Sequence, residues 1–206
     1  MAIFMSGGIR DKDIPSGFTR LSYIESTGTQ HIDSGFSNET GFRITCTVEL
    51  TSLSSQLSML FGSHDTSSPY YRNYLAVTSV SNFEVGAYDP VPAGAANVGE
   101  KLKIDCCTID QAIGLLINGA NRGIDQSSTS AKRSSRTVYI FALNYADGLF
   151  NAKMKLYDMQ IYSDIYKKQL VRNFIPCVNE SGSVGLYDTV TQQFYSNSGT
   201  GSFSGG

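Results

Sequence analysis

The stretch Phe42–Thr51, with the sequence FRITCTVELT, decides the fold class of this 206-residue chain. Apolar and polar residues alternate along it without a break, and several of them are β-branched. A helix with this sequence would spread its apolar side chains around the whole helix axis, whereas a strand places them on one face. The alternation therefore predicts an antiparallel strand with one buried face and one solvent-exposed face. The buried face is expected to carry Phe42, Ile44, Cys46, Val48 and Leu50.

Short runs of the same kind recur along the chain and are separated by turn signals. The strongest of these signals is Asn118-Gly119, which predicts a β-hairpin. No segment has the length and the period of an amphipathic helix. The chain is therefore predicted to be all-β, a two-sheet antiparallel jelly-roll sandwich. The further strands expected are Leu21–Ser26, Gln30–Ser34, Leu57–Gly62, Tyr74–Val80, Phe83–Tyr88, Lys101–Cys106, Ile113–Ile117, Val138–Leu143, Met154–Ile161, Val184–Asp188 and Gln193–Ser196.

Five stretches carry more detailed expectations. Val138–Leu143 is apolar on both faces, which predicts a central strand whose outer face is also covered. The apolar phase slips at Leu156-Tyr157, which indicates a β-bulge or a strand covered on both sides. Lys167–Phe174 fits either a last strand before Pro176 or a single helical turn. His64–Asn73 is expected to be a long polar loop, and Asp89–Asn97 a surface connection.

Charge and cysteine content exclude several classes of partner. The net charge of −2 argues against a nucleic-acid partner held through its phosphates. The one basic cluster, Lys132, Arg133 and Arg136, adjoins a Ser/Thr run and is expected to be a solvated loop. No apolar run approaches the roughly 20 residues that span a bilayer, so no membrane partner is expected. The four cysteines lack C-x-x-C spacing and are expected to be small buried apolar residues.

The first 17 residues differ in composition from the rest. They are rich in glycine and charge, lack an apolar period and end near Pro15. They predict a flexible N-terminal leader or docking peptide over 1–17, followed by one jelly-roll domain over 18–206. Neither a basic n-region nor a full apolar h-region is present, so no secretion signal is expected.

Recognisable motifs are spread over residues 18–206. They are LSYIESTGTQHIDSG at 21–35, LLING at 115–119, IFALN at 140–144, KLY at 155–157, FIPC at 174–177, GLYD at 185–188, FY at 194–195 and GTG at 199–201. Together they resemble the concanavalin A-like, laminin-G-like jelly-roll domains of phage structural proteins and gut-bacterial surface proteins. The resemblance implies the fold. It implies no single function, because this fold hosts lectins, hydrolases and structural modules, and no catalytic residue is carried over with it.

The residues give little support for catalysis. Glycosidases use paired carboxylates flanking the cleaved bond, and no E-x-D-x-x-E spacing occurs. His64 beside Asp65 is expected to be solvated rather than to hold a metal. Asp89 and Asp147 lie in loops that could hold a rim Ca²⁺, but no acidic cluster supports such a site. We therefore expect no enzyme, no metal and no cofactor.

Two aromatic stretches are the candidate ligand-binding sites. The first comprises Tyr70, Tyr71, Arg72, Asn73 and Tyr74, and the second Asn144, Tyr145 and Asp147. Tyrosine rings stack on the axial hydrogens of sugars while Arg and Asn bond the hydroxyls, and interface aromatics act likewise on proteins. The alternative is that Tyr70 and Tyr74 cap the core and that Asn144 orders a turn. The 12 tyrosines without a tryptophan suit a protein surface equally well.

Three functions remain open from the sequence. The first is a non-enzymatic bacteriophage virion surface protein, lectin-like, that binds host or mucosal glycans and docks on other virion proteins through residues 1–17. The second is a structural capsid-decoration or tail protein whose loops contact neighbouring subunits. The third is a glycan hydrolase whose carboxylates meet only on folding. A homo-oligomer is expected, displayed on the virion and made in the host cytoplasm.

Overall fold

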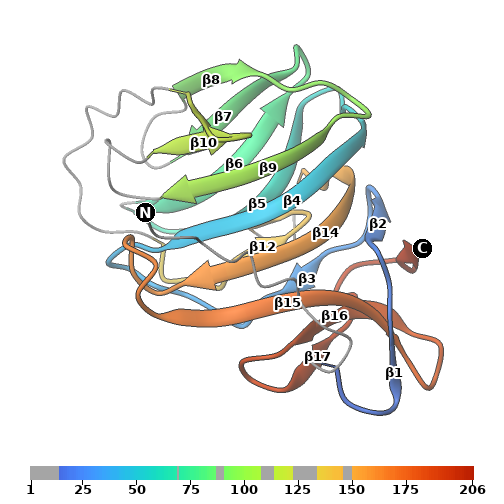
Figure 1. The fold of residues 1–206 in the computed structure, drawn as a ribbon. Coiled ribbons are helices and arrows are strands. Elements are labelled where there is room, and N and C mark those ends of the chain that lie inside the picture. Colours follow the sequence, from blue (N-terminus) through green and yellow to red (C-terminus); the bar gives the residue numbers. More distant parts are fainter. Residues whose placement is uncertain (1–13, 69, 87–90, 108–113, 123–133, 146–149) are drawn as a thin grey trace, which may run out of the picture.

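The computed structural model describes residues 14–68, 70–86, 91–107, 114–122, 134–145 and 150–206. Within these ranges the regular elements are strands arranged in two sheets, which confirms the predicted all-β sandwich. Figure 1 shows the curved layer of β9, β4, β14 and β15 lying against the layer that contains β5, β6 and β7. None of the described residues forms a helix of the length and hydropathy that crossing a membrane requires.

The first sheet is antiparallel throughout its described part. Its strands in spatial order are β11 (Ala120–Asn121), β10 (Leu115–Ile117), β9 (Lys101–Cys107), β4 (Arg43–Ser52), β14 (Lys153–Tyr162), β15 (Leu170–Asn179), β16 (Val184–Asp188) and β17 (Gln193–Tyr195). Three short strands branch from this order: β1 (Phe18–Arg20) pairs with β15, β2 (Ile24–Thr27) with β14, and β18 (Ser204–Gly205) with β2.

The second sheet is smaller. Its spatial order is β3 (Ile32–Asp33), β12 (Tyr139–Ile140), β5 (Leu57–His64), β6 (Arg72–Thr78), β7 (Asn82–Gly86) and β8 (Val91–Ala95). In addition, β13 (Leu143–Asn144) pairs with β5 in parallel.

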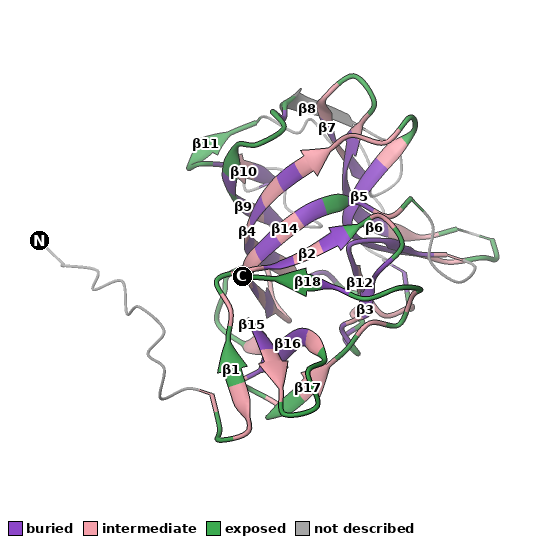
Figure 2. Ribbon diagram, turned by 90° about the vertical axis from the view of Figure 1, so that its right-hand side faces the viewer, coloured by how far each residue is buried: buried purple, intermediate pink, exposed green. Residues whose placement is uncertain are grey.

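The core lies between the two sheets, where β4 supplies the alternation that the sequence predicts. Ile44, Cys46, Val48 and Leu50 are buried and the residues between them are only partly buried, so β4 appears striped in Figure 2. The second sheet contributes buried residues that include Leu60, Phe61, Leu75, Val77, Phe83 and Val85. Burying a side chain of this size stabilises the fold by about 1.5–3 kcal/mol, so the core fixes which face of each strand points inward. All four cysteines are buried and free, as expected.

Two local predictions are confirmed. In the pairing of β14 with β4, Leu156 lies opposite Val48 and Asp158 opposite Thr47, so Tyr157 is the extra residue of a bulge. At the predicted hairpin, Asn118 and Gly119 join β10 to β11 with φ of 52° and 81°, the left-handed pair of a type I′ turn.

Three predicted boundaries are wrong in one direction, because strands run further than the turn residues indicate. The predicted loop His64–Asn73 is shorter, since His64 ends β5 and Arg72 opens β6. The predicted connection Asp89–Asn97 contains β8. Of the two alternatives for Lys167–Phe174, the strand is confirmed from Leu170 onward, but that strand continues through Pro176 instead of ending before it. The N–H and C=O of one strand residue point to the same side, and the Pro176 carbonyl accepts from the Leu21 backbone N (2.9 Å) just past the end of β1. The missing N–H of Pro176 therefore falls where the ladder with β1 has already ended.

Three further predicted strands are longer than the strands that form. The N-terminal strands are shorter than Leu21–Ser26 and Gln30–Ser34, and they keep only β2 and β3. Val138–Leu143 is not one central strand, because Phe141 adopts a left-handed φ of 71° that separates β12 from β13. Its burial on both faces is nevertheless confirmed, since Leu143 joins a second apolar cluster with Met59, Tyr74 and Ala76.

The candidate leader at 1–17 falls largely outside the described residues, which begin at 14. Residues 14–17 precede β1, where the Phe18 backbone N donates to the Pro15 carbonyl (3.4 Å). The division of the chain at residue 17 stays a prediction.

Candidate functional site

The turn between β5 and β6 exposes the first predicted aromatic stretch. Tyr70 is 52% exposed and adopts a left-handed φ of 57°, and its backbone N donates to the Ser67 carbonyl (2.8 Å). Tyr71 is partly exposed, and its carbonyl accepts from the backbone N of Asp65 (2.8 Å). The turn is thus closed by its own backbone and presents two tyrosines at the end of the second sheet.

The fold brings the second predicted stretch to the same end of this sheet. Ser63 of β5 pairs with Asn73 of β6 in antiparallel register and with Asn144 of β13 in parallel register. Residues about seventy positions apart in the sequence therefore flank the last residues of β5. We call this end of the sheet, with Tyr70–Asn73, His64 and Asn144–Tyr145, the β5 end.

His64 lies in the middle of the β5 end and is partly buried, so the expectation of a solvated loop histidine is wrong. Its ring stacks on Tyr145 with a centroid separation of 4.8 Å and an interplanar angle of 26°. Arg72 is its cross-strand partner on β6. Burial lowers the pKa of His64, and the positive charges of Arg72 and Arg136 lower it further, against the opposing effect of Asp65. The imidazole is therefore neutral at pH 7.

Arg136 is anchored at this end rather than solvated with a basic cluster. Its Nη1 donates to Asn144 Oδ1 (2.9 Å), while Asn144 Nδ2 donates to the Thr137 carbonyl (2.8 Å) and to Thr137 Oγ1 (3.1 Å). Asn144 is only 7% exposed, so its amide is occupied in holding Arg136 and Thr137. The other two members of the predicted cluster, Lys132 and Arg133, lie outside the described residues.

The segment after residue 133 is tied to β5 and β6 through polar side chains. Asp65 Oδ1 accepts from Ser134 Oγ (2.7 Å) and from the Ser135 backbone N (3.1 Å). In the amide orientation that satisfies both of its ends, Asn73 accepts from the Ser134 backbone N (3.2 Å). These bonds seat Arg136 beside the sheet.

Tyr74 is buried against the second sheet and is not exposed at the β5 end. It is 6% exposed, and its Oη donates to Glu84 Oε1 (2.6 Å). Both of its cross-strand neighbours, Gly62 and Gly86, are glycines, and a Cβ at either would collide with the tyrosine. Burial and the Glu84 carboxylate raise the pKa of Tyr74, so it remains a neutral hydrogen-bond donor.

The predicted site residues therefore divide into two groups. Tyr70, Tyr71, Arg72 and Tyr145 are exposed or partly exposed. Asn73, Tyr74 and Asn144 are buried and bonded internally, the supporting role that the sequence left open for Tyr74 and Asn144. Asp147 and Asp89 lie outside the described residues. His64, Asp65, Ser134 and Arg136 were not chosen from the sequence; the adjacency of His64 and Asp65 to the tyrosines was the one signal available.

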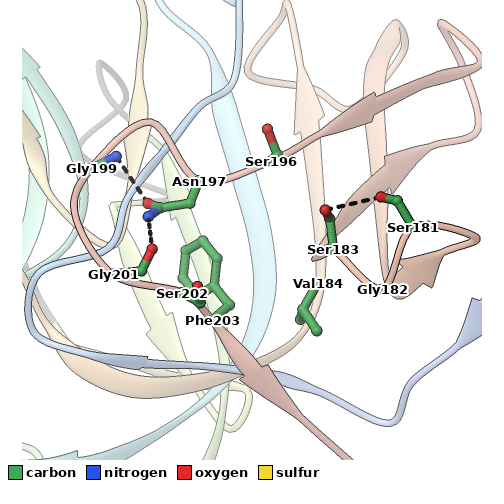
Figure 3. A pocket seen from close by; sticks show the side chains of 10 residues that line it. All are labelled: Ser181, Gly182, Ser183, Val184, Ser196, Asn197, Gly199, Gly201, Ser202 and Phe203. Atoms are coloured by element: carbon green, nitrogen blue, oxygen red, sulfur yellow. Dashed lines mark hydrogen bonds between the residues drawn. The ribbon is translucent and has the colours of Figure 1, made fainter.

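A second candidate is a polar hollow of about 380 Å³ near the C-terminus. Figure 3 shows the Ser181–Val184 turn on one side of it and the Asn197–Phe203 segment on the other. Asn197 is already engaged, since it accepts from the Gly199 backbone N (2.9 Å) and donates to the Gly201 carbonyl (3.0 Å). The aromatic residue of the lining, Phe203, is 5% exposed, so the hollow offers hydroxyls without a ring face.

No metal centre is apparent in the described part of the chain, where no three His, Cys, Asp or Glu side chains gather into a possible ligand set.

Comparisons with known proteins bear on the fold. No protein-family model and no curated protein matches the sequence. Among solved structures, a Bacteroides ovatus protein whose suggested role is carbohydrate binding aligns with a TM-score of 0.65 at 10% identity, over 91% of this chain and 60% of that one. NanB sialidase from Streptococcus pneumoniae aligns with a TM-score of 0.50 at 12% identity, over 71% of this chain and 27% of that one.

A third solved structure, Trypanosoma rangeli sialidase in complex with sialic acid, also aligns with a TM-score of 0.50 at 12% identity, over 74% of this chain and 28% of that one. This chain thus spans 60% of the Bacteroides protein and less than a third of either sialidase. At such identities the likeness concerns the backbone arrangement. The chain accordingly has the β-sandwich fold of a jelly-roll type that is shared with a protein considered to bind carbohydrate.

Proposed function

We propose that this chain is a carbohydrate-binding domain and that the β5 end holds the glycan. The observation that carries the proposal is the convergence there of Tyr70, Tyr71 and Tyr145 with Arg72, since Tyr145 stacks on His64 and Arg72 is the cross-strand partner of His64. Flat amphipathic rings stack on sugar faces, and guanidinium groups donate to hydroxyls and ring oxygens. The sandwich fold and its likeness to the Bacteroides protein support the proposal.

The proposal is one of binding without cleavage. Two described carboxylates beside the β5 end already accept hydrogen bonds: Asp65 accepts from Ser134 and Ser135, and Glu84 accepts from Tyr74. Most glycoside hydrolases need one carboxyl group free to protonate the leaving oxygen and another free to act as base or nucleophile. Incubating the protein with any glycan that it binds should therefore release no reducing sugar.

The test is binding of purified protein to a glycan array and to host cells, comparing wild type with Tyr70→Ala/Tyr71→Ala. Tyr166→Ala is the matched control, because Tyr166 is 63% exposed but lies between β14 and β15. We expect the double variant to lose at least tenfold in affinity and the control to keep wild-type affinity. Absence of glycan binding by the wild type, or equal loss in both variants, would overturn the proposal.

We further propose that the domain is displayed on a bacteriophage virion as a homo-oligomer. The support is the sequence resemblance to domains of phage structural proteins, together with the glycine-rich residues 1–17 as a docking peptide. Mass spectrometry and antibody labelling of purified particles would test this location. Detection of the protein in infected cells but not on particles would refute it.

A structural role is the second candidate, in which the tyrosines of the β5 end contact neighbouring subunits. Exposed Tyr70 favours it as much as it favours a glycan, because tyrosine is enriched at protein interfaces. The same Tyr70→Ala/Tyr71→Ala variant separates the two functions. Loss of oligomers with unchanged glycan binding would support the structural role.

A further inference from the structure

Another hollow, of about 270 Å³, lies where β5 begins, at the opposite end of that strand from the β5 end. Its lining comes from the turn between β4 and β5, Ser54–Leu57, and from Phe150 and Asn151 ahead of β14. The fold joins the two parts, because the Met59 backbone N donates to the Phe150 carbonyl (2.8 Å) and Asn151 forms a parallel bridge with Met59. We call this site the Phe150 hollow.

Phe150 is held in a backbone conformation that is unfavourable for phenylalanine. Its φ is 58°, in the left-handed region, where glycine or asparagine is the usual residue because a larger side chain crowds the backbone. The residue is 36% exposed, so burial of its ring offsets this cost only in part. Tyr70 of the β5 end combines the same two features, with a φ of 57° and 52% exposure. Strained residues cluster at ligand sites, and β5 has one exposed, strained aromatic residue beside each of its ends.

The polar part of the lining is ordered by hydrogen bonds within the protein. Ser54 Oγ donates to the Leu57 carbonyl (2.7 Å), and the Ser54 backbone N donates to Ser58 Oγ (3.1 Å). Asn151 is fixed separately, because its Nδ2 donates to the Gln30 carbonyl (3.1 Å). A turn and a side chain that are already ordered lose little conformational entropy when a ligand binds to them.

The composition of the lining fits an uncharged sugar. All six residues that line the hollow are uncharged, so a carboxylate or sulfate would lose water there without gaining an opposite charge from them. The Phe150 ring offers an apolar face for a pyranose, while the side-chain amides of Gln56 and Asn151 can both donate and accept hydrogen bonds. The volume is near the lower limit for small-molecule sites, which suits a mono- or disaccharide. The larger hollow near the C-terminus lacks such a ring face, since Phe203 is 5% exposed.

We propose that the Phe150 hollow is a second carbohydrate subsite, which takes a neutral sugar ring stacked on Phe150. At about 3.3 Å per residue, the eight residues of β5 separate the hollow from the β5 end by roughly 20 Å, so one disaccharide cannot occupy both. The domain is therefore expected to bind a disaccharide at each place. This inference rests on the proposed carbohydrate binding and adds a site and its sugar class.

The test titrates isotope-labelled protein with disaccharides and follows the backbone amide signals by nuclear magnetic resonance. The neutral sugars are maltose, cellobiose, lactose and galactobiose, and digalacturonate is the charged counterpart of galactobiose. Phe150→Asn removes the ring at a φ that asparagine tolerates, and Phe150→Tyr keeps a ring in the same place. Gln192→Asn is the matched control, because Gln192 is also exposed with a left-handed φ of 58° but lies between β16 and β17 of the other sheet.

In wild type, at least one neutral disaccharide should shift the signals of Ser54–Leu57 and Asn151, and digalacturonate should not. Phe150→Asn should lower the affinity of that sugar for the hollow at least tenfold. Its urea midpoint should stay close to that of wild type, because the released backbone strain offsets the lost contacts of the ring. Phe150→Tyr and Gln192→Asn should keep the wild-type affinity within twofold.

The other outcomes overturn different statements. Signals that move at Tyr70 and Tyr71 but not at the hollow would refute this inference and leave the proposed function in place. Signals that move only at the hollow would support the inference and refute the assignment of the glycan to the β5 end. Movement at neither place would refute the hollow as a site for neutral sugars, whereas the proposed function fails only if the glycan array is negative too. Equal affinity in wild type and Phe150→Asn would show that the ring holds no sugar, and the wild-type signals alone keep the test decisive if that variant fails to fold.

Discussion

Replacing Gly86 by alanine tests the packing beneath the β5 end. Tyr74 of β6 covers the Gly86 backbone of β7, and a Cβ built there would lie less than 3.0 Å from three carbons of the ring. Gly86 does not have a left-handed φ, so alanine is compatible with the backbone and the whole effect comes from the collision. The ring of Tyr74 must therefore move.

The expected cost follows from what the ring loses. Forcing an extra methyl into a packed site costs about 1–3 kcal/mol. Displacing the ring also breaks the 2.6 Å bond from Tyr74 Oη to Glu84, and a bond to a charged group contributes about 1.5–3 kcal/mol. Because the two losses overlap, we expect Gly86→Ala to lower the free energy of unfolding by about 3 kcal/mol. In urea this corresponds to a midpoint lowered by about 1 M.

A double-mutant cycle isolates the collision. Tyr74→Ala alone should destabilise by about 3–5 kcal/mol, as for other large aromatic truncations. In that background Gly86→Ala should be nearly neutral, because the ring it strikes is gone. Urea unfolding followed by tyrosine fluorescence and far-ultraviolet circular dichroism gives all four free energies. Equal costs of Gly86→Ala in both backgrounds, within about 0.5 kcal/mol, would refute the reasoning.

Two further predictions concern pH and a buried acid. Burial lowers the pKa of His31 and His64 from 6.5. The unfolded chain therefore binds more protons below pH 6.5, so stability is full above that pH and falls as the pH drops toward the native pKa values. The urea midpoint of the wild type should be lower at pH 5.5 than at pH 8, and this difference should be smaller in His31→Gln/His64→Gln. An unchanged wild-type midpoint would contradict the prediction. Asp188 is fully buried, and its Oδ2 lies 3.6 Å from Arg172 Nε. Asp188→Ala should lower the free energy of unfolding by about 3–5 kcal/mol, because it leaves the Arg172 cation uncompensated. A melting temperature within about 2 °C of wild type, roughly 1 kcal/mol or less, would rule this out.

The sequence alone determined the fold class and several local features. Phe42–Leu50 alternates because one face of β4 is buried, and side-chain direction in a strand depends only on position along the chain. The Asn118-Gly119 turn and the bulge at Tyr157 could also be predicted, because each is set by a few adjacent residues. The exposed tyrosines were recognisable because they lie among polar residues between two apolar runs.

Only the tertiary structure decided which of these residues act together. Arg136 and His64 were predicted to be solvated because nothing adjacent in sequence pairs with them, yet Asn144 of β13 binds Arg136 and Tyr145 stacks on His64. Tyr74 was grouped with the candidate ligand-binding tyrosines of the loop, but strand pairing packs it against Gly62 and Gly86 and buries it. Contacts between strands far apart in the chain depend on register and loop closure, and these are settled by packing of the whole core rather than by local pattern.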